Sequence, residues 1–282
     1  MSQTTTKPTD NNIFKTEGTP QTNQAFIRPK QSANVLFKCM KRLDYLKSTL
    51  KSKAILPRYY EEKIDYLDIK EIDKIAFPMS CFCDIHLNKL IDHMGNYGDF
   101  AIGMNKDWGI RQGIQPIHYI NEYSILGKDF SSIFNHATHA ADDQRKDFSA
   151  YNNYLLTDLL FMKPLEGEMM TENGYEIRNF HDEREWRFIP NINEVDTELP
   201  LVIPQQQMNE KSYGAYSEAI QTRPELWLKF ELSAIKYIIV TDKSSKMELI
   251  NFLRDHNVAE NEEEFFDLVS KIMVFNDLKE DW

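Results

Sequence analysis

The sharpest chemical feature of the sequence is the segment HDEREWRF at residues 181–188. Because side chains alternate between the two faces of a strand, we expect Glu183, Glu185 and Arg187 to share one face. Crowded carboxylates raise each other's pKa and a neighbouring guanidinium lowers it, so this trio suits acid–base work or binding of ribose hydroxyls. The alternative is an edge strand with a solvated, ion-paired polar face and an aromatic face in the core.

A second group that could do chemistry consists of Cys81, Cys83, His86 and His93. Its spacing does not match a structural zinc site and the sequence has no second cysteine pair, so we predict no metal. The two cysteines are expected to be small buried hydrophobic residues. No Walker loop, G-x-G-x-x-G, G-x-S-x-G or HExxH motif occurs, which disfavours P-loop NTPases, simple Rossmann dehydrogenases, α/β-hydrolases and zincins.

Composition narrows the classes of partner. The 282 residues carry a formal net charge of −11, which disfavours general binding to nucleic acid or to anionic membranes. We therefore expect a protein partner or a nucleotide-type small molecule. No apolar run approaches the ~18 residues that span a bilayer, no secretion leader is recognisable, and the odd number of cysteines does not indicate a disulfide framework. These features predict a cytoplasmic protein.

Residues 77–120 are predicted to form the secondary structure around which the candidate side chains are placed. This block predicts a strand, a helix, a second strand, a short helix and a third strand, with glycine stops between them. Asp84 ends the first strand and is a candidate helix N-cap. The block is mostly apolar or glycine, so we expect it to form the sheet core and the floor of a cleft, with Glu183 and Glu185 arriving opposite it.

The rest of the chain predicts one α+β domain at residues 31–282, after a disordered tail at residues 1–30 that is poor in apolar residues. We expect a mixed, mostly antiparallel sheet of about six to eight strands wrapped by helices. The dipeptide Asn173-Gly174 predicts a hairpin turn. Residues 191–224 contain few periodic apolar residues and predict a long loop.

Residues 77–120 resemble the signature of the AbiGi-type abortive phage-resistance proteins. That signature consists of a strand, a helix, a YGxYGIG strand, a KeW turn and a GiNPVxYI strand, and each has a counterpart in this segment. The later segments MKPLEG and EREWRFIP are similar to the KPxxG and EREWR patterns of that family. The residues that match the central signature are Met79, Cys81, Phe82, Cys83, Asp84, Ile85, Leu87, His93, Tyr97, Gly98, Ile102, Gly103, Lys106, Trp108, Gly109, Gly113, Pro116, Tyr119 and Ile120. The resemblance implies a role in bacterial anti-phage defence and, through the antitoxin label of the family, a partner toxin or other defence subunit.

A looser similarity links the order of elements to ADP-ribosyltransferase folds, which implies NAD as the cofactor. In such folds a late glutamate binds the nicotinamide ribose hydroxyls and stabilises an oxocarbenium-like centre. The catalytic residues that this similarity implies are Glu185 and Glu183, and the cofactor-binding residues are Lys38, Tyr59, Ser80 and Arg187.

The sequence leaves two functions open. The first is an ADP-ribosyltransferase-like enzyme that consumes NAD or modifies a target. The second is a non-catalytic antitoxin or sensor that binds a partner toxin, which is favoured by the acidic composition and by Lys38, because AbiGi-type relatives tend to have a His-containing FHFT phrase there.

Overall fold

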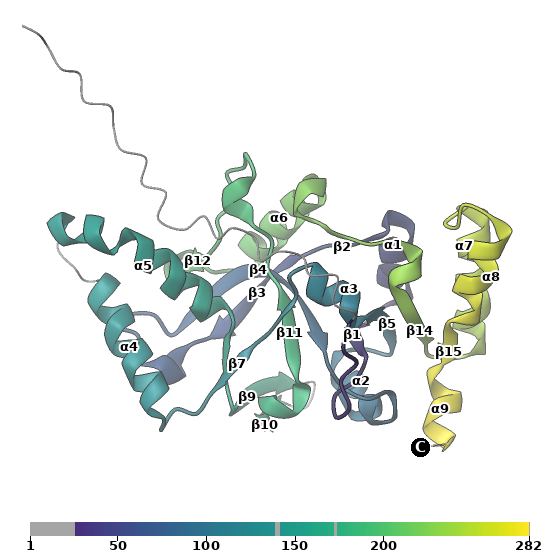
Figure 1. Ribbon diagram of the computed structural model, residues 1–282, viewed down its shortest axis with the longest axis horizontal. Coiled ribbons are helices and arrows are strands. Elements are labelled where there is room, and N and C mark those ends of the chain that lie inside the picture. The colour runs from purple at the N-terminus through teal and green to yellow at the C-terminus, as the bar shows by residue number, and fades with distance from the viewer. Residues whose placement is uncertain (1–25, 139–141, 172–173, 282) are drawn as a thin grey trace, which may run out of the picture.

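The computed structural model describes residues 26–138, 142–171 and 174–281. Its central feature is a mixed, mostly antiparallel sheet with helices packed around it, so the α+β prediction is confirmed (Figure 1). Residues 1–25 of the predicted tail, and residues 172 and 173 of the predicted hairpin turn, lie outside the described residues. None of the helices in the described ranges combines the length and the hydropathy of a membrane-spanning segment.

The main sheet is organised along the path β15-β14-β5-β1-β4-β11-β6, and β3 and β12 also pair with β4. Its pairs are antiparallel except β14 with β15. The strands of this sheet are β1 (Val35–Met40), β3 (Arg58–Lys63), β4 (Lys74–Cys83), β5 (Phe100–Asn105), β6 (Gln115–Pro116), β11 (Glu185–Phe188), β12 (Ile203–Pro204), β14 (Ile235–Val240) and β15 (Ile272–Val274).

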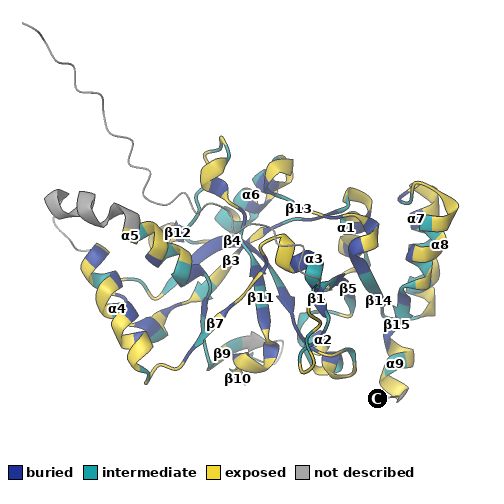
Figure 2. Cartoon of the chain, in the orientation of Figure 1, coloured by how far each residue is buried: buried dark blue, intermediate teal, exposed yellow. Residues whose placement is uncertain are grey.

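The long strand β4 connects two parts of the sheet. Its first half pairs with β3 and β12, and its last residues pair with β11 and, at Cys83, with Phe37 of β1. Most of β4 is buried on both faces, which explains its nearly continuous apolar sequence. Figure 2 shows the strands at the centre of the molecule largely buried and the outer helix surfaces exposed.

Helices and short strands complete the domain. The helices are α1 (Leu43–Ser52), α2 (Leu90–Tyr97), α3 (Lys106–Arg111), α4 (Ile125–Thr138), α5 (Asp142–Leu160), α6 (Glu210–Gln221), α7 (Lys243–Asp255), α8 (Glu262–Ser270) and α9 (Phe275–Asp281). The remaining strands are β2 (Ala54–Ile55), β7 (His118–Ile120), β8 (Met162–Pro164), β9 (Glu166–Thr171), β10 (Gly174–Asn179) and β13 (Leu228–Lys229). Strands β9 and β10 form the predicted hairpin.

Two local predictions are wrong. Asp84 does not cap a helix, because its carboxylate pairs with the ammonium of Lys106 at 2.5 Å in a buried site. The segment 191–224 is not a continuous loop, because it contains α6. That helix begins after Asn209, whose side chain accepts a hydrogen bond from the main-chain N–H of Ser212, a common N-cap arrangement.

Candidate functional site

A cleft of about 1430 Å³ lies along β4 and is lined by residues of β1, β3, α2, the β9–β10 hairpin and the turn before β11. Both predicted catalytic glutamates, Glu183 and Glu185, line it, and so does Lys38 of β1. The lining mixes cationic, anionic and aromatic side chains. Such a mixture fits a polar ligand that also has a flat ring.

Local backbone geometry places the two glutamates. Residues Phe180–Glu183 form a 3₁₀ turn, and Arg184 then adopts a left-handed conformation with φ of 44° before β11 begins. Glu185 and Arg187 therefore share one buried face of β11, as predicted. Glu183 is not on that strand, so the prediction of three side chains on one strand face is wrong for this residue.

The turn nevertheless brings the two carboxylates to one cation. The ammonium of Lys163, in β8, donates to Glu183 Oε2 at 3.0 Å and to Glu185 Oε2 at 2.9 Å. The hydroxyl of Tyr97, at the end of α2, donates to Glu183 Oε1. Lys163, Tyr97 and Glu183 thus come from β8, α2 and the turn before β11, and all three line the cleft.

Arg187 holds the other carboxylate oxygen of Glu185. Its side chain is fully buried, and its Nε donates to Glu185 Oε1 at 2.6 Å. Its Nη1 donates to the carbonyl of Leu160 at 2.8 Å, and its Nη2 lies 3.1 Å from Glu62 Oε2. The main-chain N–H of Glu185 also donates to the hydroxyl of Tyr119 at 2.7 Å. The Glu185 carboxylate is thus held in one orientation.

The charges of this network reinforce one another. Burial alone raises the pKa of Glu185, but Arg187 and Lys163 reverse this effect and hold that pKa far below its ordinary value. Burial lowers the pKa of Lys163, and Glu185, Glu62 and Glu183 more than restore it, so the pKa is raised. Glu185 is therefore an ionised acceptor and Lys163 an ionised donor at neutral pH.

Lys38 and Cys39 contribute a second group of ionisable side chains to the cleft. Burial lowers the pKa of Lys38, and nearby Arg58 adds to this, although the thiols of Cys81 and Cys39 oppose it. Hydrogen bonding with Cys83, and to a smaller extent His93, lowers the pKa of Cys39 to about 6. The His93 ring in turn packs against Tyr97, with centroids 4.5 Å apart.

Three of the predicted cofactor-binding residues, Tyr59, Ser80 and Arg187, do not line the cleft, and Arg187 contributes to it only by holding Glu185. Ser80 is opposite Phe188 in the β4–β11 register, on the face of β4 away from Arg187, and it is fully buried. Tyr59 is buried in an apolar cluster with Ile203 and donates its hydroxyl to the carbonyl of Pro200. The expected convergence of these two side chains with Lys38 and Glu185 is therefore wrong.

Sequence reasoning missed three side chains that complete the site, namely Lys163, Tyr97 and Glu62. Their partners lie 20, 86 and 125 positions away at Glu183, Glu183 and Arg187, so no local pattern connects them. Lys163 lies in the MKPLEG segment and Tyr97 in the YGDFAIG segment, both of which match family patterns. Those matches to family patterns could have identified Lys163 and Tyr97 as candidate site residues.

The described part of the chain has no group of three or more His, Cys, Asp and Glu side chains arranged to hold a metal ion. The three cysteines are unpaired thiols.

The amino-acid sequence is similar to that of one family of known proteins. Residues 53–241 match the model of a family described as "Putative abortive phage resistance protein AbiGi, antitoxin". A protein of Lactococcus lactis subsp. cremoris named "Abortive phage resistance protein AbiGi" is 34% identical over 255 residues, which cover 81% of this chain and 100% of that protein. No solved structure gives a significant match.

Proposed function

The chain belongs to the AbiGi family of abortive phage resistance proteins. We propose that it acts in anti-phage defence by binding NAD in the cleft and transferring its ADP-ribosyl group to water or to a nucleophile of a target, with nicotinamide as the leaving group. The observation that carries this proposal is the convergence of Glu183 and Glu185 on one ammonium, that of Lys163, in a cleft that Lys38 also lines.

The residues present fit such a ligand. Each carboxylate oxygen has two acceptor sites, so Glu183 and Glu185 keep acceptor capacity for ribose hydroxyls beyond the bonds to Lys163 and Tyr97. Lys38 supplies positive charge for phosphate oxygens. Tyr60, which lines the cleft and is partly exposed, supplies an aromatic face for a flat ring.

NAD would supply an ADP-ribosyl group whose ribose becomes cationic as nicotinamide leaves. The role of Glu185 is to place an ionised, immobile carboxylate next to that developing charge, because Arg187 and Lys163 hold it in one position before reaction. Preorganised charge of this kind needs no reorientation during the reaction. Tyr97 and Lys163 orient Glu183 in the same way and act as positioning residues.

The test is release of nicotinamide from NAD by the purified full chain, with and without lysate from phage-infected cells. Glu185→Gln keeps the shape of the side chain and should reduce release by at least about 100-fold, the scale seen when one electrostatic catalytic group is lost. Glu168→Gln is the matched control, since this carboxylate also lines the cleft but is mostly exposed. Absence of release in every condition, or equal release by Glu185→Gln in folded protein, would contradict the proposal.

A second candidate function, that of an antitoxin that binds a partner toxin, is favoured by the surface of the α4–α5 region. Large hydrophobic side chains in and next to these two helices are exposed, at Tyr123, Ile125, Leu126, Ile133, Tyr151 and Tyr154. Figure 2 shows the outer side of α4 as largely exposed. An exposed apolar surface of this kind often marks a protein-binding site.

Co-expression with the product of a neighbouring toxin gene tests this second candidate. The chain should relieve toxicity, and the double variant Ile125→Lys/Ile133→Lys should lose this effect while remaining folded. Ile177→Lys, at an exposed position of β10, is the matched control and should keep it. Rescue that the double variant retains in full would exclude α4 as the binding surface.

A further inference from the structure

A second pocket, which shares no lining residue with the cleft, lies between the segment before β1, helix α3 and the chain from β13 to β14. Its volume is about 540 Å³. Five basic side chains line it, at Arg28, Lys106, Arg111, Lys229 and Lys236, against two acidic ones at Asp107 and Glu231. In a chain with a net charge of −11, this is a local reversal of sign.

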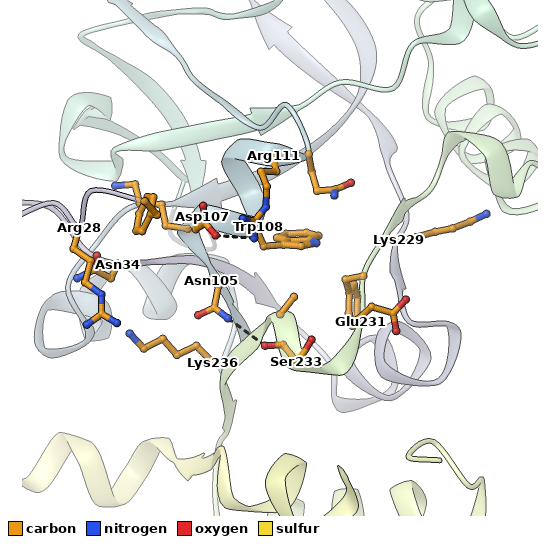
Figure 3. Close-up of a pocket in the computed structure, with 15 residues that line it drawn as sticks. Arg28, Asn34, Asn105, Asp107, Trp108, Arg111, Lys229, Glu231, Ser233 and Lys236 are labelled. Atoms are coloured by element: carbon orange, nitrogen blue, oxygen red, sulfur yellow. Dashed lines mark hydrogen bonds and ion pairs between the residues drawn. The ribbon is translucent and has the colours of Figure 1, made fainter. Parts of the chain in front are cut away.

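The basic side chains differ in how far their charge is already matched. Lys106 is paired with Asp84 at 2.5 Å, and Arg111 is paired with Asp107 at 2.6 Å. In contrast, neither Arg28 nor Lys236 lies within ion-pair distance of a carboxylate of the described residues. Figure 3 shows these two cations pointing toward one another at one end of the pocket, with Asn34 beside Arg28. Two like charges facing one another are destabilising, and an anion between them would relieve the repulsion.

Lys236 reaches the pocket because of an irregularity in the sheet. In the pairing of β14 with β5, Ile235 is opposite Met104 but Tyr237 is opposite Gly103, so Lys236 is an extra residue in a β-bulge. Bulges re-aim a side chain and are common next to functional sites. Beyond the bulge, Tyr237 and Ile238 again alternate between the two faces of the sheet, in separate hydrophobic clusters. The bulge therefore interrupts a regular strand at the lysine that lines the pocket.

Asn34 requires a hydrogen-bond donor, whereas the two cations require an anion. Its side-chain Oδ1 is buried and has no hydrogen-bond partner in the described part of the chain. Leaving a buried acceptor without a donor is destabilising. A ligand that offered only anionic oxygens would leave this acceptor unpaired, whereas a ligand with hydroxyl or amino groups next to its phosphates would satisfy it.

We propose that this pocket binds a nucleoside phosphate, with the phosphates between Arg28 and Lys236 and a ligand hydroxyl or amino group donating to Asn34. Trp108 and Phe230, whose rings meet edge to face at 6.3 Å, supply the apolar wall for the rest of the ligand. The site is independent of NAD chemistry in the cleft.

Calorimetric titration of the full chain in EDTA tests this proposal with ATP, inorganic triphosphate and adenosine as probes. ATP should bind, and Arg28→Gln and Lys236→Gln should each weaken it at least about 10-fold, as expected for loss of one charge-assisted contact. Lys229→Gln is the matched control, because Figure 3 shows this lysine at the opposite end of the pocket, and it should change the affinity less than about 3-fold.

Further arms of the titration separate this pocket from the cleft and the nucleoside from bare phosphate. Lys38→Gln should leave ATP binding unchanged, and Asn34→Leu should weaken ATP but not triphosphate. The proposal is overturned if ATP does not bind below about 1 mM, a free energy of about −4 kcal/mol, or if Arg28→Gln and Lys236→Gln bind normally. Loss of binding in Lys38→Gln alone would place ATP in the cleft, and equal affinity for triphosphate would overturn the nucleoside part.

Discussion

Replacing Lys163 by methionine removes the ammonium that bridges Glu183 and Glu185. The ammonium is mostly buried, with a side-chain exposure of 12%, and the glutamates are exposed by 11% and 7%. Breaking a buried ion pair by removing one partner typically costs about 3–5 kcal/mol, because the other charge is left uncompensated. We expect a loss near the lower end, about 3 kcal/mol at pH 7, because Arg187 still neutralises Glu185 and Tyr97 still donates to Glu183.

The loss should depend on pH with a definite sign. In the parent protein the folded-state pKa of Glu185 is lowered, so its contribution to stability is present above the unfolded pKa of about 4.3 and is lost as the pH falls below it. In Lys163→Met two close carboxylates lack their shared cation, which raises the pKa of at least one of them above the unfolded value. Protonation then stabilises the variant as the pH falls from 7 to 5, so the difference from the parent should shrink over that interval.

Urea unfolding of both proteins at pH 7, 6 and 5 measures this difference directly. Lys63→Met is the matched control, because this lysine is 49% exposed and pairs with Glu168 at 3.4 Å on the surface. Its loss should stay below about 1 kcal/mol and should be nearly independent of pH. The double variant Lys163→Met/Glu183→Gln should recover about 1 kcal/mol or more, since one unpaired charge is removed with its partner.

Two results would refute this reasoning. A cost below about 1 kcal/mol for Lys163→Met would mean that the bridge is effectively solvated, since exposed pairs contribute on that scale. A deficit that stays constant or grows as the pH falls from 7 to 5 would mean that the carboxylates do not take up a proton in the folded variant. Either result would also weaken the claim that Glu185 is preorganised by fixed charges.

Three further predictions concern single residues. Gly98→Ala should lower the free energy of unfolding by about 1–3 kcal/mol in urea titrations, because Gly98 has φ of 124° and an added Cβ would collide with the carbonyl of Met40. Iodoacetamide alkylation of the native protein, followed by mass spectrometry, should label Cys39, with a midpoint of the labelling rate near pH 6, and should spare Cys83. Hydrogen bonding lowers the pKa of the Cys39 thiol, whereas burial raises the pKa of the Cys83 thiol. Equal labelling of the two cysteines would contradict this prediction. Ser80→Ala should leave the free energy of unfolding unchanged or raise it by up to about 1 kcal/mol, because the Ser80 hydroxyl is buried without a partner in the described chain. The NAD affinity should not change, because Ser80 does not line the cleft. A loss of NAD affinity in folded protein would mean that Ser80 does contribute to the site.

Local patterns predicted the elements with clear periodicity. Residues 77–120 contain the predicted strand, helix, second strand and short helix as β4, α2, β5 and α3, followed by the short strands β6 and β7, and Leu90 and Met94 of α2 are buried. Such patterns record which side chains avoid water, and the spacing alone identifies the element. Asp84 was misread because the choice between capping a helix and pairing with Lys106 depends on a residue 22 positions away.

Some features of the candidate site could likewise be predicted from local sequence, and others depended on long-range contacts. Alternation along a strand was enough to place Glu185 and Arg187 on one face, and motif similarity was enough to identify the family. The position of Glu183 depended on the left-handed backbone at Arg184, and the assignment of Ser80 and Tyr59 depended on which face of the sheet borders the cleft. Lys163 and Tyr97 became part of the site through contacts between distant elements. The sequence by itself thus determined the residue types, the elements and the family, while the tertiary structure decided which charges meet, because ion pairs form by proximity in space and chain spacing does not encode it.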